Sequence, residues 1–449
     1  MKIARDILES PAYLGALAII QRLRDRGHEA YVVGGAPRDL LLGTRPTDYD
    51  IATGARPAQV RALFDRTIPV GEQFGVVLVL LDKTPYEVAT FRADGEYLDG
   101  RRPTRVHFCA PREDALRRDF TVNALMFDPA ERRILDFVGG RRDLRLRRIR
   151  TVGDPDERFA EDHLRLIRAV RFAARLDFRI ERRTFAAIRR LAPLVAKVAA
   201  ERLGAEWVKI LTGPRAGQAL RLLSETGLLA HLMPEAEALR GCEQPPNFHP
   251  EGDVFTHTSL MLDAAKRPSP ALGLALLLHD IAKPPTQRRT PERIRFDGHC
   301  ELGAEMAGRI CRRLKLPRAV IERVQYLVAN HLRIKDAPNM RPARLKRFLR
   351  EEGFPELMEL FRLDSLASHG DLEGYQWCRR TFEELSREQI APPPLLTGHD
   401  LIAMGYRPGP LFKTILTAVE TAQLEGELAA PDDARRFVRR RFPLPSDSR

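Results

Sequence analysis

The segment from residue 34 to residue 53 constrains the fold of this chain more than any other. It follows the apolar run Tyr31-Val32-Val33, which is typical of a buried strand, and it begins with a glycine pair that ends at Gly35. Glycines let the backbone approach a ligand closely, and Pro37 favours the first turn of a helix. Arg38 then lies near a helix N-terminus, where free backbone amides favour an anion such as a triphosphate. The pattern predicts a strand, a glycine turn and a short helix beside a phosphate site.

Two aspartates follow on the next predicted strand, at residues 47–51. Because side chains alternate across a strand, Asp48 and Asp50 would project from the same face. Adjacent carboxylates repel each other, and a pair of Mg²⁺ ions relieves this repulsion while holding the attacking and leaving oxygens of a nucleotidyl transfer. An isolated Asp-x-Asp is more often a solvated strand end, and an isolated Gly-Gly is more often a turn. Their combination in one compact unit arises by accident far less often than either alone, and it indicates a site for phosphoryl or nucleotidyl transfer.

The neighbouring segments predict a mixed sheet backed by helices. Apolar residues recur at helical spacing over residues 4–27, a short helix is expected near 58–64, and strands are expected at 76–81 and 86–92. Glu87 falls on the last of these strands. It is either a third carboxylate beside the aspartate pair or, as we favour, a surface residue of an edge strand.

A second polar motif lies at 117–124, after a loop at 92–112 that is rich in glycine, proline and arginine. Arg118 would hold phosphate, and Asp119 would accept a hydrogen bond from a ribose 2′-OH and so select ribonucleotides. A helix-start cap would explain Asp119, although not the whole motif. Further on, the alternation at 144–147 predicts a half-exposed strand close to a domain boundary.

A third motif opens a long helix that is predicted from residue 158 onward. Asp162 and Arg165 are three residues apart, so on a helix they would be neighbours and present one acceptor beside several donors. Cytosine and adenine share an exocyclic amine next to an unprotonated ring nitrogen, which such a pair would recognise, whereas guanine and uracil show the opposite pattern. Arg168 and Arg171 continue the same face. A surface ion pair is the alternative for an isolated Asp-x-x-Arg.

Taken in order, these motifs resemble those of the class II tRNA nucleotidyltransferases, the CCA-adding enzymes, and their bacterial poly(A) polymerase relatives. The resemblance covers residues 31 to about 210, and in it Glu201, Arg202 and Glu206 would brace the base-reading helix. It departs at Ala36-Pro37, where the family has a small and then an aliphatic residue. It implies catalytic, metal-binding aspartates at Asp48 and Asp50 and a flexible loop at 97–103. The substrate-binding residues that it implies are Gly35, Arg38, Arg92, Arg118, Asp119, Asn123, Asp162, Arg165, Arg168 and Arg171.

The second half of the chain carries histidines and aspartates on separate segments, and this set resembles the His-Asp (HD) phosphohydrolase superfamily. The resemblance implies a divalent metal with four ligands, which are His257, His279, Asp280 and Asp364. His299 follows on another segment, and Lys283 or His331 would hold phosphate. The alternative is that these histidines are packed side chains in an RNA-binding scaffold.

Composition limits the partners and the compartment. The net charge of +13 favours a polyanionic partner, because it attracts phosphates. The five cysteines lack Cys-x-x-Cys spacing, so they indicate neither a disulfide framework nor a zinc finger, and we expect a reducing cytoplasm. No apolar run has the length of a membrane span. The arginine-rich tail at 435–441 would contact RNA or be solvated.

We therefore expect a multidomain, crescent-like chain. An α/β head of the polymerase-β type, with a mixed sheet and helices, would cover residues 1–142, and an all-α neck, body and tail would cover 143–225, 226–390 and 391–449. The expected function is template-independent addition of CCA to the tRNA 3′ end from CTP and ATP, with Mg²⁺ in the head and a second divalent metal in the HD region. A poly(A) polymerase and an enzyme that adds only part of CCA remain alternatives. An HD phosphohydrolase with an RNA-binding head is the alternative from another class.

Overall fold

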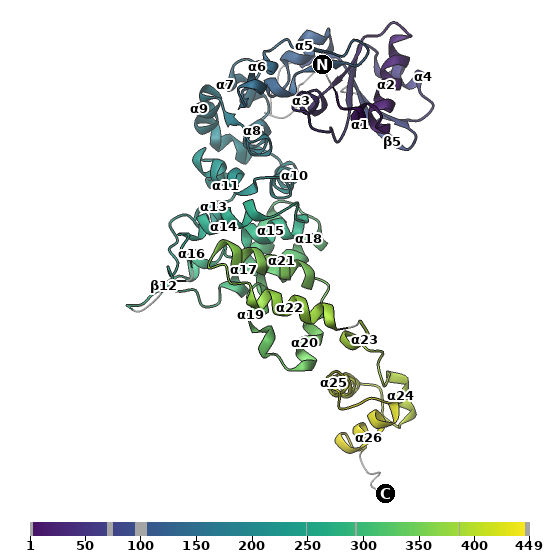
Figure 1. The fold of residues 1–449 in the computed structure, drawn as a ribbon, viewed down its shortest axis with the longest axis vertical. Coiled ribbons are helices and arrows are strands. Elements are labelled where there is room, and N and C mark those ends of the chain that lie inside the picture. Colours follow the sequence, from purple (N-terminus) through teal and green to yellow (C-terminus); the bar gives the residue numbers. More distant parts are fainter. Residues whose placement is uncertain are drawn as a thin grey trace. The chain divides into compact units, whose positions relative to one another are not determined.

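The computed structural model describes residues 3–69, 75–94, 106–247, 249–291, 294–385 and 387–444. The chain divides into two compact units along the ribbon of Figure 1. The first unit comprises Met1–Glu237 with Arg313–Lys315, and the second comprises Ala238–Arg312 with Leu316–Arg449. The predicted division into four domains stays a prediction. The loop predicted at 97–103 lies outside the described residues.

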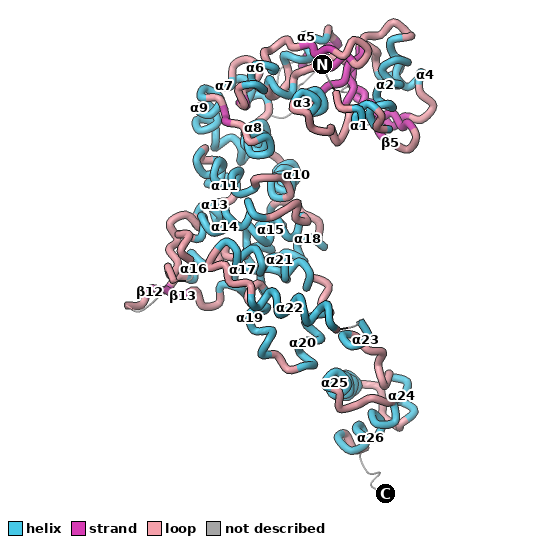
Figure 2. The backbone as a smooth tube through the Cα atoms, viewed as in Figure 1, coloured by secondary structure: helices cyan, strands magenta, loops and turns pink. Residues whose placement is uncertain are grey.

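A seven-stranded sheet forms the centre of the first part of unit 1. Its strands, in order across the sheet, are β3 (Thr67–Ile68), β4 (Val76–Leu81), β5 (Thr84–Thr90), β2 (Asp50–Thr53), β1 (Ala30–Val33), β8 (Met126–Asp128) and β9 (Arg133–Leu135). Strands β2 and β5 are parallel, whereas the other neighbours are antiparallel. The predicted mixed sheet is therefore confirmed, and Figure 2 shows its strands in magenta among cyan helices.

Helices α2 (Pro11–Arg24) and α4 (Pro57–Leu63) cover the sheet and share one apolar core with it. Ile19 of α2, Ile51 of β2 and Val77 of β4 are fully buried there. The helix predicted over 4–27 is in fact two helices, α1 (Arg5–Leu8) and α2. The break falls at Ser10, whose hydroxyl accepts the N–H of Tyr13 at 3.3 Å and so caps α2.

The remaining elements of this part are short. They are helix α3 (Gly35–Leu41), strands β6 (Arg92–Asp94) and β7 (Val106–Phe108), helix α5 (Pro111–Leu116), the 3₁₀ turn η2 (Thr121–Asn123), helix α6 (Gly140–Arg145) and strand β10 (Arg148–Ile149). The strand predicted at 144–147 is wrong, because most of α6 precedes it and β10 begins only at Arg148. Asp136 favours the helix, since its Oδ1 accepts the N–H groups of Gly139 and Gly140 at 2.8 and 2.9 Å.

A set of helices completes unit 1. They are α7 (Pro155–Glu161), α8 (Leu164–Leu176), α9 (Arg182–Leu191), the 3₁₀ turn η3 (Ala192–Lys197), α10 (Ala200–Leu211), α11 (Ala216–Glu225), α12 (Leu228–Leu232) and α13 (Pro234–Glu237), with β11 (Arg179–Ile180) paired to β10. Helix α8 packs against α10 and α11 and is almost entirely buried. The long helix predicted from residue 158 is interrupted, because Asp162 is extended, with φ −140° and ψ 104°.

Unit 2 is built around helix α15 (Pro270–Leu278), whose residues from Ala271 onward are all buried. Its neighbours are α14 (Val254–Ala264), α18 (Arg318–Asn330) and α21 (Phe354–Ala367). Shorter elements complete this part: α16 (Lys283–Thr286), β12 (Arg288–Arg289), β13 (Ile294–Arg295), α17 (His299–Arg313), α19 (Arg333–Asp336), η4 (Ala337–Asn339), α20 (Pro342–Leu349), α22 (Glu373–Glu384) and α23 (Arg387–Ile390). None of the helices that the structure describes is both long enough and apolar enough to cross a membrane.

The end of unit 2 contains α24 (Gly398–Ala403), α25 (Pro410–Glu425) and α26 (Pro431–Arg441), which share a small apolar core. The basic run at 435–441 belongs to α26. Phe437 and Val438 face this core, whereas Arg435 pairs with Asp432 at 2.8 Å. Phe437 is therefore a packing residue of the helix, and the arginines form its exposed side.

Candidate active site and candidate metal centre

A cleft of about 650 Å³ in unit 1 collects nearly all the residues predicted for nucleotide binding. It is lined by Gly35, Arg38, Asp48, Asp50, Arg118, Asp119, Asn123, Asp162, Arg165, Arg168 and Arg171 of the predicted set, together with Glu87 and others. These side chains come from β2, α3, the turn η2 and the α7–α8 region. Arg92, on β6, does not line this cleft.

Three carboxylates of the cleft, those of Asp48, Asp50 and Glu87, lie on or just before two adjacent strands, β2 and β5. Asp50 is the first residue of β2, and Asp48 precedes the strand, so β2 begins later than predicted. Strand β5 lies between β4 and β2, and its residue Glu87 stands one position before Val88, the partner of Ile51. Burial, reinforced by the charges of Glu87 and Asp48, raises the pKa of Asp50 to about 7. Glu87 is exposed as expected, but β5 is not an edge strand, so that part of the interpretation is wrong. Glu87 lines the cleft and is a third carboxylate beside Asp50.

Gly34 is placed where only glycine fits. Its φ is +73°, and a Cβ at this position would lie 2.7 Å from Asp50 Oδ2. Next to it, Arg38 of α3 is buried and donates from Nε to Asp39 at 2.8 Å and from Nη1 to Asn123 at 2.6 Å. Arg38 and Asn123 therefore join the glycine turn to the η2 turn at the back of the cleft.

One acidic residue, Asp114, holds the two arginines at the start of the 117–124 motif. Buried Asp114 accepts hydrogen bonds from Arg117 at 2.6 Å and from Arg118 at 2.9 Å. Although burial alone would raise it, these two guanidinium groups hold the pKa of Asp114 below its usual value. Arg118 thus reaches the cleft with part of its guanidinium already fixed.

Asp119 links this motif to helix α8. Its Oδ2 accepts from Arg168 Nη2 at 2.5 Å and from Arg168 Nε at 3.0 Å, while its Oδ1 accepts the N–H of Phe120 at 2.7 Å. Burial opposes ionisation, but the charge of Arg168 keeps the pKa of Asp119 below its usual value. The hydrogen bond to a ribose 2′-OH that was predicted for Asp119 would have to be shared with Arg168.

Asp162 and Arg165 both line the cleft, but they are not neighbours on one helix as predicted. Asp162 lies between α7 and α8, where its Oδ1 accepts the N–H of Leu164 at 3.1 Å. Arg202 of α10 donates two hydrogen bonds to Asp162, to Oδ1 at 3.1 Å and to Oδ2 at 2.8 Å. Arg165 instead donates to Glu161 at 2.5 Å. Acceptor and donor are therefore fixed by separate partners.

The predicted bracing of the base-reading helix is present at two of the three positions. Besides the Arg202 pair, Glu206 accepts from Arg171 at 2.6 Å, and both of these side chains are buried. Lys209 adds a contact to Glu206 at 3.2 Å. Glu201, by contrast, is exposed. Helix α10 thus holds α8 by charged hydrogen bonds on the cleft side.

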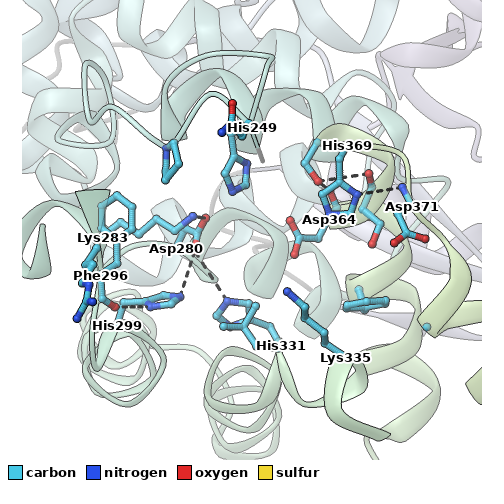
Figure 3. A pocket seen from close by; sticks show the side chains of 18 of the residues that line it. His249, Asp280, Lys283, Phe296, His299, His331, Lys335, Asp364, His369 and Asp371 are labelled. Carbon is cyan, nitrogen blue, oxygen red and sulfur yellow. Dashed lines mark hydrogen bonds and ion pairs between the residues drawn. The ribbon is translucent and has the colours of Figure 1, made fainter. Parts of the chain in front are cut away.

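A second cavity, of about 1050 Å³, lies in unit 2 and is lined by Asp280 and Asp364 of the HD residues (Figure 3). His257 comes from α14, His279 and Asp280 follow α15, and Asp364 comes from α21. Ligand atoms of His257, His279 and Asp364 lie within 4.8 Å of one another. Lys283 donates to Asp280 at 2.7 Å and to Gln244 at 2.6 Å. The four predicted metal ligands are therefore brought together from three parts of the chain.

The ring orientation of these histidines is suited to metal binding. Nδ1 of His279 lies 3.0 Å from the carbonyl oxygen of Leu276, so Nδ1 carries the hydrogen and Nε2 offers a lone pair. Nε2 of His257 and of His279 are buried and make no hydrogen bond to any described residue. His257 Nε2 is 3.0 Å from Asp364 Oδ1, outside hydrogen-bonding geometry. Imidazole nitrogens and carboxylates with unused lone pairs are a donor set that fits a divalent metal ion.

Sequence reasoning missed two residues next to His257, which are Glu251 and His249. Glu251 Oε1 accepts from His257 Nδ1 at 2.6 Å and contacts His249 Nδ1 at 2.9 Å. Burial disfavours a charge on His257, but the carboxylates of Asp364 and Glu251 outweigh it and raise the pKa of His257 to about 9. The position therefore favours a positive charge, either a proton or a metal ion. Glu251 is six residues before His257 and precedes α14, and no sequence pattern separates it from a surface glutamate.

Three family models match successive parts of the chain. The model described as "Poly A polymerase head domain" matches residues 30–150, the one described as "Probable RNA and SrmB- binding site of polymerase A" matches 177–239, and the HD domain matches 254–368. Nucleotidyltransferase heads of this type and HD domains depend in general on divalent metal ions.

Comparison with whole proteins gives long matches. The CCA-adding enzyme of Bacillus velezensis is 33% identical over 420 residues, which cover 93% of this chain and 95% of that protein. The CCA-adding enzyme of Geobacillus thermodenitrificans is 50% identical over 228 residues, so the chain spans 56% of the length of that relative. The crystal structure of the Bacillus stearothermophilus CCA-adding enzyme in complex with CTP has a TM-score of 0.74 at 32% identity, covering 96% of this chain and 98% of that chain.

Proposed function

This chain belongs to the family of CCA-adding enzymes, and on that premise we propose that it adds C, C and A to the 3′ end of tRNA from CTP and ATP. The observation that carries the proposal is the cleft of unit 1. Asp48, Asp50, Asp162 and Arg165 all line it. Carboxylates that would bind metal ions, and a hydrogen-bond acceptor and donors that would read the edge of a base, therefore line the same cleft. The cleft volume of about 650 Å³ is within the range of small-molecule sites.

Asp48, Asp50 and Glu87 would hold Mg²⁺, which supplies charge neutralisation between the attacking and leaving oxygens. Asp50 supports this, because burial, and then the charges of Glu87 and Asp48, raise its pKa to about 7, and the charge of Arg118 only partly offsets them. Arg118 and Arg175 line the same cleft and would contact the triphosphate. Gly35 would let the backbone approach it.

Base selection would rest on the unused lone pair of Asp162 and the unused N–H groups of Arg165. Among the described residues, Asp162 Oδ2 receives a hydrogen bond from Arg202 alone, so it can still accept one from an exocyclic amine. Arg165 Nη2 donates to the carbonyl oxygen of Arg117 at 3.1 Å and retains a second hydrogen for a ring nitrogen. Cytosine and adenine match this pattern, and guanine and uracil do not.

The test is nucleotide incorporation by the purified full-length chain. Three tRNA transcripts are supplied, lacking the whole CCA end, its last two nucleotides or its last nucleotide, with each NTP alone and in mixtures. The proposal expects two C residues and one A residue in that order, and then no further extension. Continued addition of A would show a poly(A) polymerase instead, and arrest after CC or addition of A alone would show a partial enzyme. The proposal includes a cytoplasmic location, where tRNA and these nucleotides occur.

A second activity is supported by the cavity of unit 2. We propose that His257, His279, Asp280 and Asp364 bind a divalent metal ion, because two buried imidazole nitrogens without hydrogen bonds face two carboxylates there. Lys283 and Lys335 line the same cavity and would attract a phosphate group. Such a site suits hydrolysis of a phosphate ester. Release of p-nitrophenol from p-nitrophenyl phosphate, or opening of a 2′,3′-cyclic nucleotide by water to a nucleoside monophosphate, with and without added metal, tests it.

A further inference from the structure

Phe172 of α8 lies at the centre of a group of arginines in the cleft of unit 1. Its side chain is 6% exposed and lines the cleft. Three guanidinium groups lie over its ring, and the distances from Cζ to the ring centroid are 4.2 Å for Arg171, 5.3 Å for Arg168 and 5.7 Å for Arg38. All three distances are within the roughly 6 Å range of a cation–π interaction, which is stronger at a site shielded from water. The reaction proposed above gives Phe172 no role.

The ring connects two helices that line the cleft. Arg168 and Arg171 belong to α8, whereas Arg38 belongs to α3, directly after the glycine turn. The ring of Phe120 packs against Phe172 edge to face, with centroids 5.8 Å apart and 72° between the ring planes. This contact fixes the plane of the Phe172 ring. The arginines of α3 and α8 are therefore held against one aromatic surface.

Each of the three guanidinium groups also binds a carboxylate. The pairs are Arg38–Asp39 at 2.7 Å, Arg168–Asp119 at 2.5 Å and Arg171–Glu206 at 2.6 Å. The group thus contains three positive and three negative charges, so it offers little net charge to a triphosphate. Fixed donors and acceptors of balanced charge suit a neutral part of the nucleotide that carries hydroxyl groups, which is the ribose.

Arg168 links the ring to the residue that is expected to contact the ribose. Its Nε and Nη2 both donate to Oδ2 of Asp119, at 3.0 and 2.5 Å. Asp119 is the carboxylate predicted to accept a hydrogen bond from the ribose 2′-OH, and it would share Oδ2 with Arg168. The position of the Arg168 guanidinium therefore affects the geometry of that hydrogen bond. The ring of Phe172 attracts this guanidinium through its electron-rich face, which an aliphatic side chain lacks.

We propose that Phe172 is a positioning residue for ribose selection. Its ring holds the guanidinium of Arg168, and through it the carboxylate of Asp119, where a 2′-OH can be recognised. The inference rests on the nucleotide site proposed above and extends it to a residue that acts through another. Loss of the aromatic face should therefore weaken the preference for a ribonucleotide over the corresponding deoxyribonucleotide.

The test is the ratio of kcat/KM for CTP to kcat/KM for dCTP, measured on tRNA that lacks CCA. Phe172→Leu keeps a large apolar side chain without an aromatic face, and it should lower this ratio by roughly tenfold. Phe178→Leu is the matched control and should leave the ratio unchanged. Phe178 is also buried and lies just after α8, and it contacts Arg147, which does not line the cleft. Circular dichroism checks that each variant is folded.

Fluorinated phenylalanines at position 172 separate the cation–π attraction from packing. Fluorine withdraws electron density from the face of the ring and changes its shape little, so mono-, tri- and pentafluorinated rings attract a guanidinium progressively less. The ratio for CTP over dCTP should fall in the same order. A ratio that stays constant along this series shows that Phe172 only fills space, and it overturns the proposal even if Phe172→Leu is impaired. A wild-type protein that does not prefer CTP to dCTP also overturns it.

Binding of CTP and dCTP without tRNA, measured by equilibrium dialysis, distinguishes this inference from the proposed function. If binding shows the graded loss of preference in a protein that adds neither C nor A to tRNA, the proposed function is overturned and the role of Phe172 stands. If the protein adds CCA but the fluorinated series has no effect on either measurement, the role of Phe172 is overturned alone. A wild-type protein that binds neither nucleotide overturns both.

Discussion

Arg202 holds both carboxylate oxygens of Asp162, at 3.1 Å and 2.8 Å, across a sequence separation of forty residues. The pair is a bidentate arginine-carboxylate contact, and both side chains are largely shielded from solvent. It fixes which lone pair of Asp162 faces the cleft. If Asp162 reads the base as proposed, base selection depends on helix α10 as well as on the residues that would touch the nucleotide.

The first prediction concerns Arg202→Ala. Without Arg202, Asp162 keeps only the hydrogen bond from the Leu164 N–H, and a charged hydrogen bond of about 1.5–3 kcal/mol no longer fixes its orientation. We expect kcat/KM for CTP and ATP to fall by roughly tenfold or more while overall tRNA binding is retained. Steady-state kinetics on tRNA that lacks CCA measure this. Arg190→Ala is the control, since the exposed Arg190–Asp156 pair contributes little. Equal effects of the two variants would contradict the bracing role.

A second prediction concerns the carboxylates of the cleft. Asp48→Ala or Asp50→Ala should abolish addition of every nucleotide, because each would remove a ligand of the proposed metal ions. Binding of tRNA, measured by filter retention, should largely survive, since phosphate contacts come from basic surfaces elsewhere. Glu87→Gln should lower kcat without changing which nucleotides are accepted. Retained addition by either aspartate variant, in preparations free of contaminating enzyme, would disprove the metal-binding role.

Gly34 allows a third prediction. Gly34→Ala places a methyl group 2.7 Å from Asp50 Oδ2 and forces alanine to a φ of +73°. The backbone strain costs about 1–3 kcal/mol, and the contact displaces the catalytic carboxylate. Both the thermal midpoint and kcat should fall. Gly43→Ala is the control for a positive φ without the contact, with φ +70° and nothing within 4 Å of the added methyl, so it should lower the midpoint alone. A normal kcat in Gly34→Ala would show that the turn tolerates a side chain.

A local sequence pattern was sufficient to predict an element where the burial of apolar side chains determines its structure. The strands at Tyr31-Val32-Val33 and 76–81 follow directly from apolar runs. The motifs also named aspartates that line the cleft of unit 1 and the cavity of unit 2. The predictions were wrong where contacts with residues distant in the sequence determine the structure. The interruption of the helix at Asp162 depends on Arg202, and the position of Glu87 depends on β5 pairing with β2 across the sheet. Neither contact leaves a local signal in the sequence.

The same limit explains Glu251. Its carboxylate fixes the ring of His257 at 2.6 Å, but it lies in an irregular segment with no periodic pattern. By contrast, the aspartate and glycine residues around 136–140 do carry a local signal. Asp136 accepts backbone N–H groups of the turn that starts α6, and an aspartate a few residues before a helix is a known capping pattern. That helix could have been predicted in place of a strand.

A fourth prediction is that the two sites can be separated. The His279→Ala/Asp280→Ala variant should lose hydrolysis of p-nitrophenyl phosphate and 2′,3′-cyclic nucleotides and keep nucleotide addition nearly intact. The reason is that the two sites lie in separate compact units. Both activities are measured on the same preparation, with His369→Gln as the control in the same cavity. If addition collapses in a variant with a normal melting profile, unit 2 supports the polymerase structurally.

The last prediction concerns base choice. If Asp162 accepts the exocyclic amine of cytosine or adenine, Asp162→Ala removes that acceptor and weakens discrimination against UTP and GTP. A hydrogen bond to a charged acceptor contributes about 1.5–3 kcal/mol, so selectivity should fall by roughly one to two orders of magnitude. The carboxylates of the metal site are untouched in this variant. Asp48→Ala should instead reduce turnover for all nucleotides alike, and it serves as the contrast.

The measurement is kcat/KM for CTP, ATP, UTP and GTP on tRNA that lacks CCA, in wild type, Asp162→Ala and Arg202→Ala. Arg202→Ala keeps the carboxylate but fixes it less firmly, so it should lose less selectivity than Asp162→Ala does. This order of effects distinguishes the residue that would contact the base, Asp162, from the residue that would only hold it in place, Arg202. If Asp162→Ala lowers all four values equally and keeps the wild-type order of preference, Asp162 is only the ion-pair partner of Arg202. Base selection would then have to rest on Arg165 and the shape of the cleft.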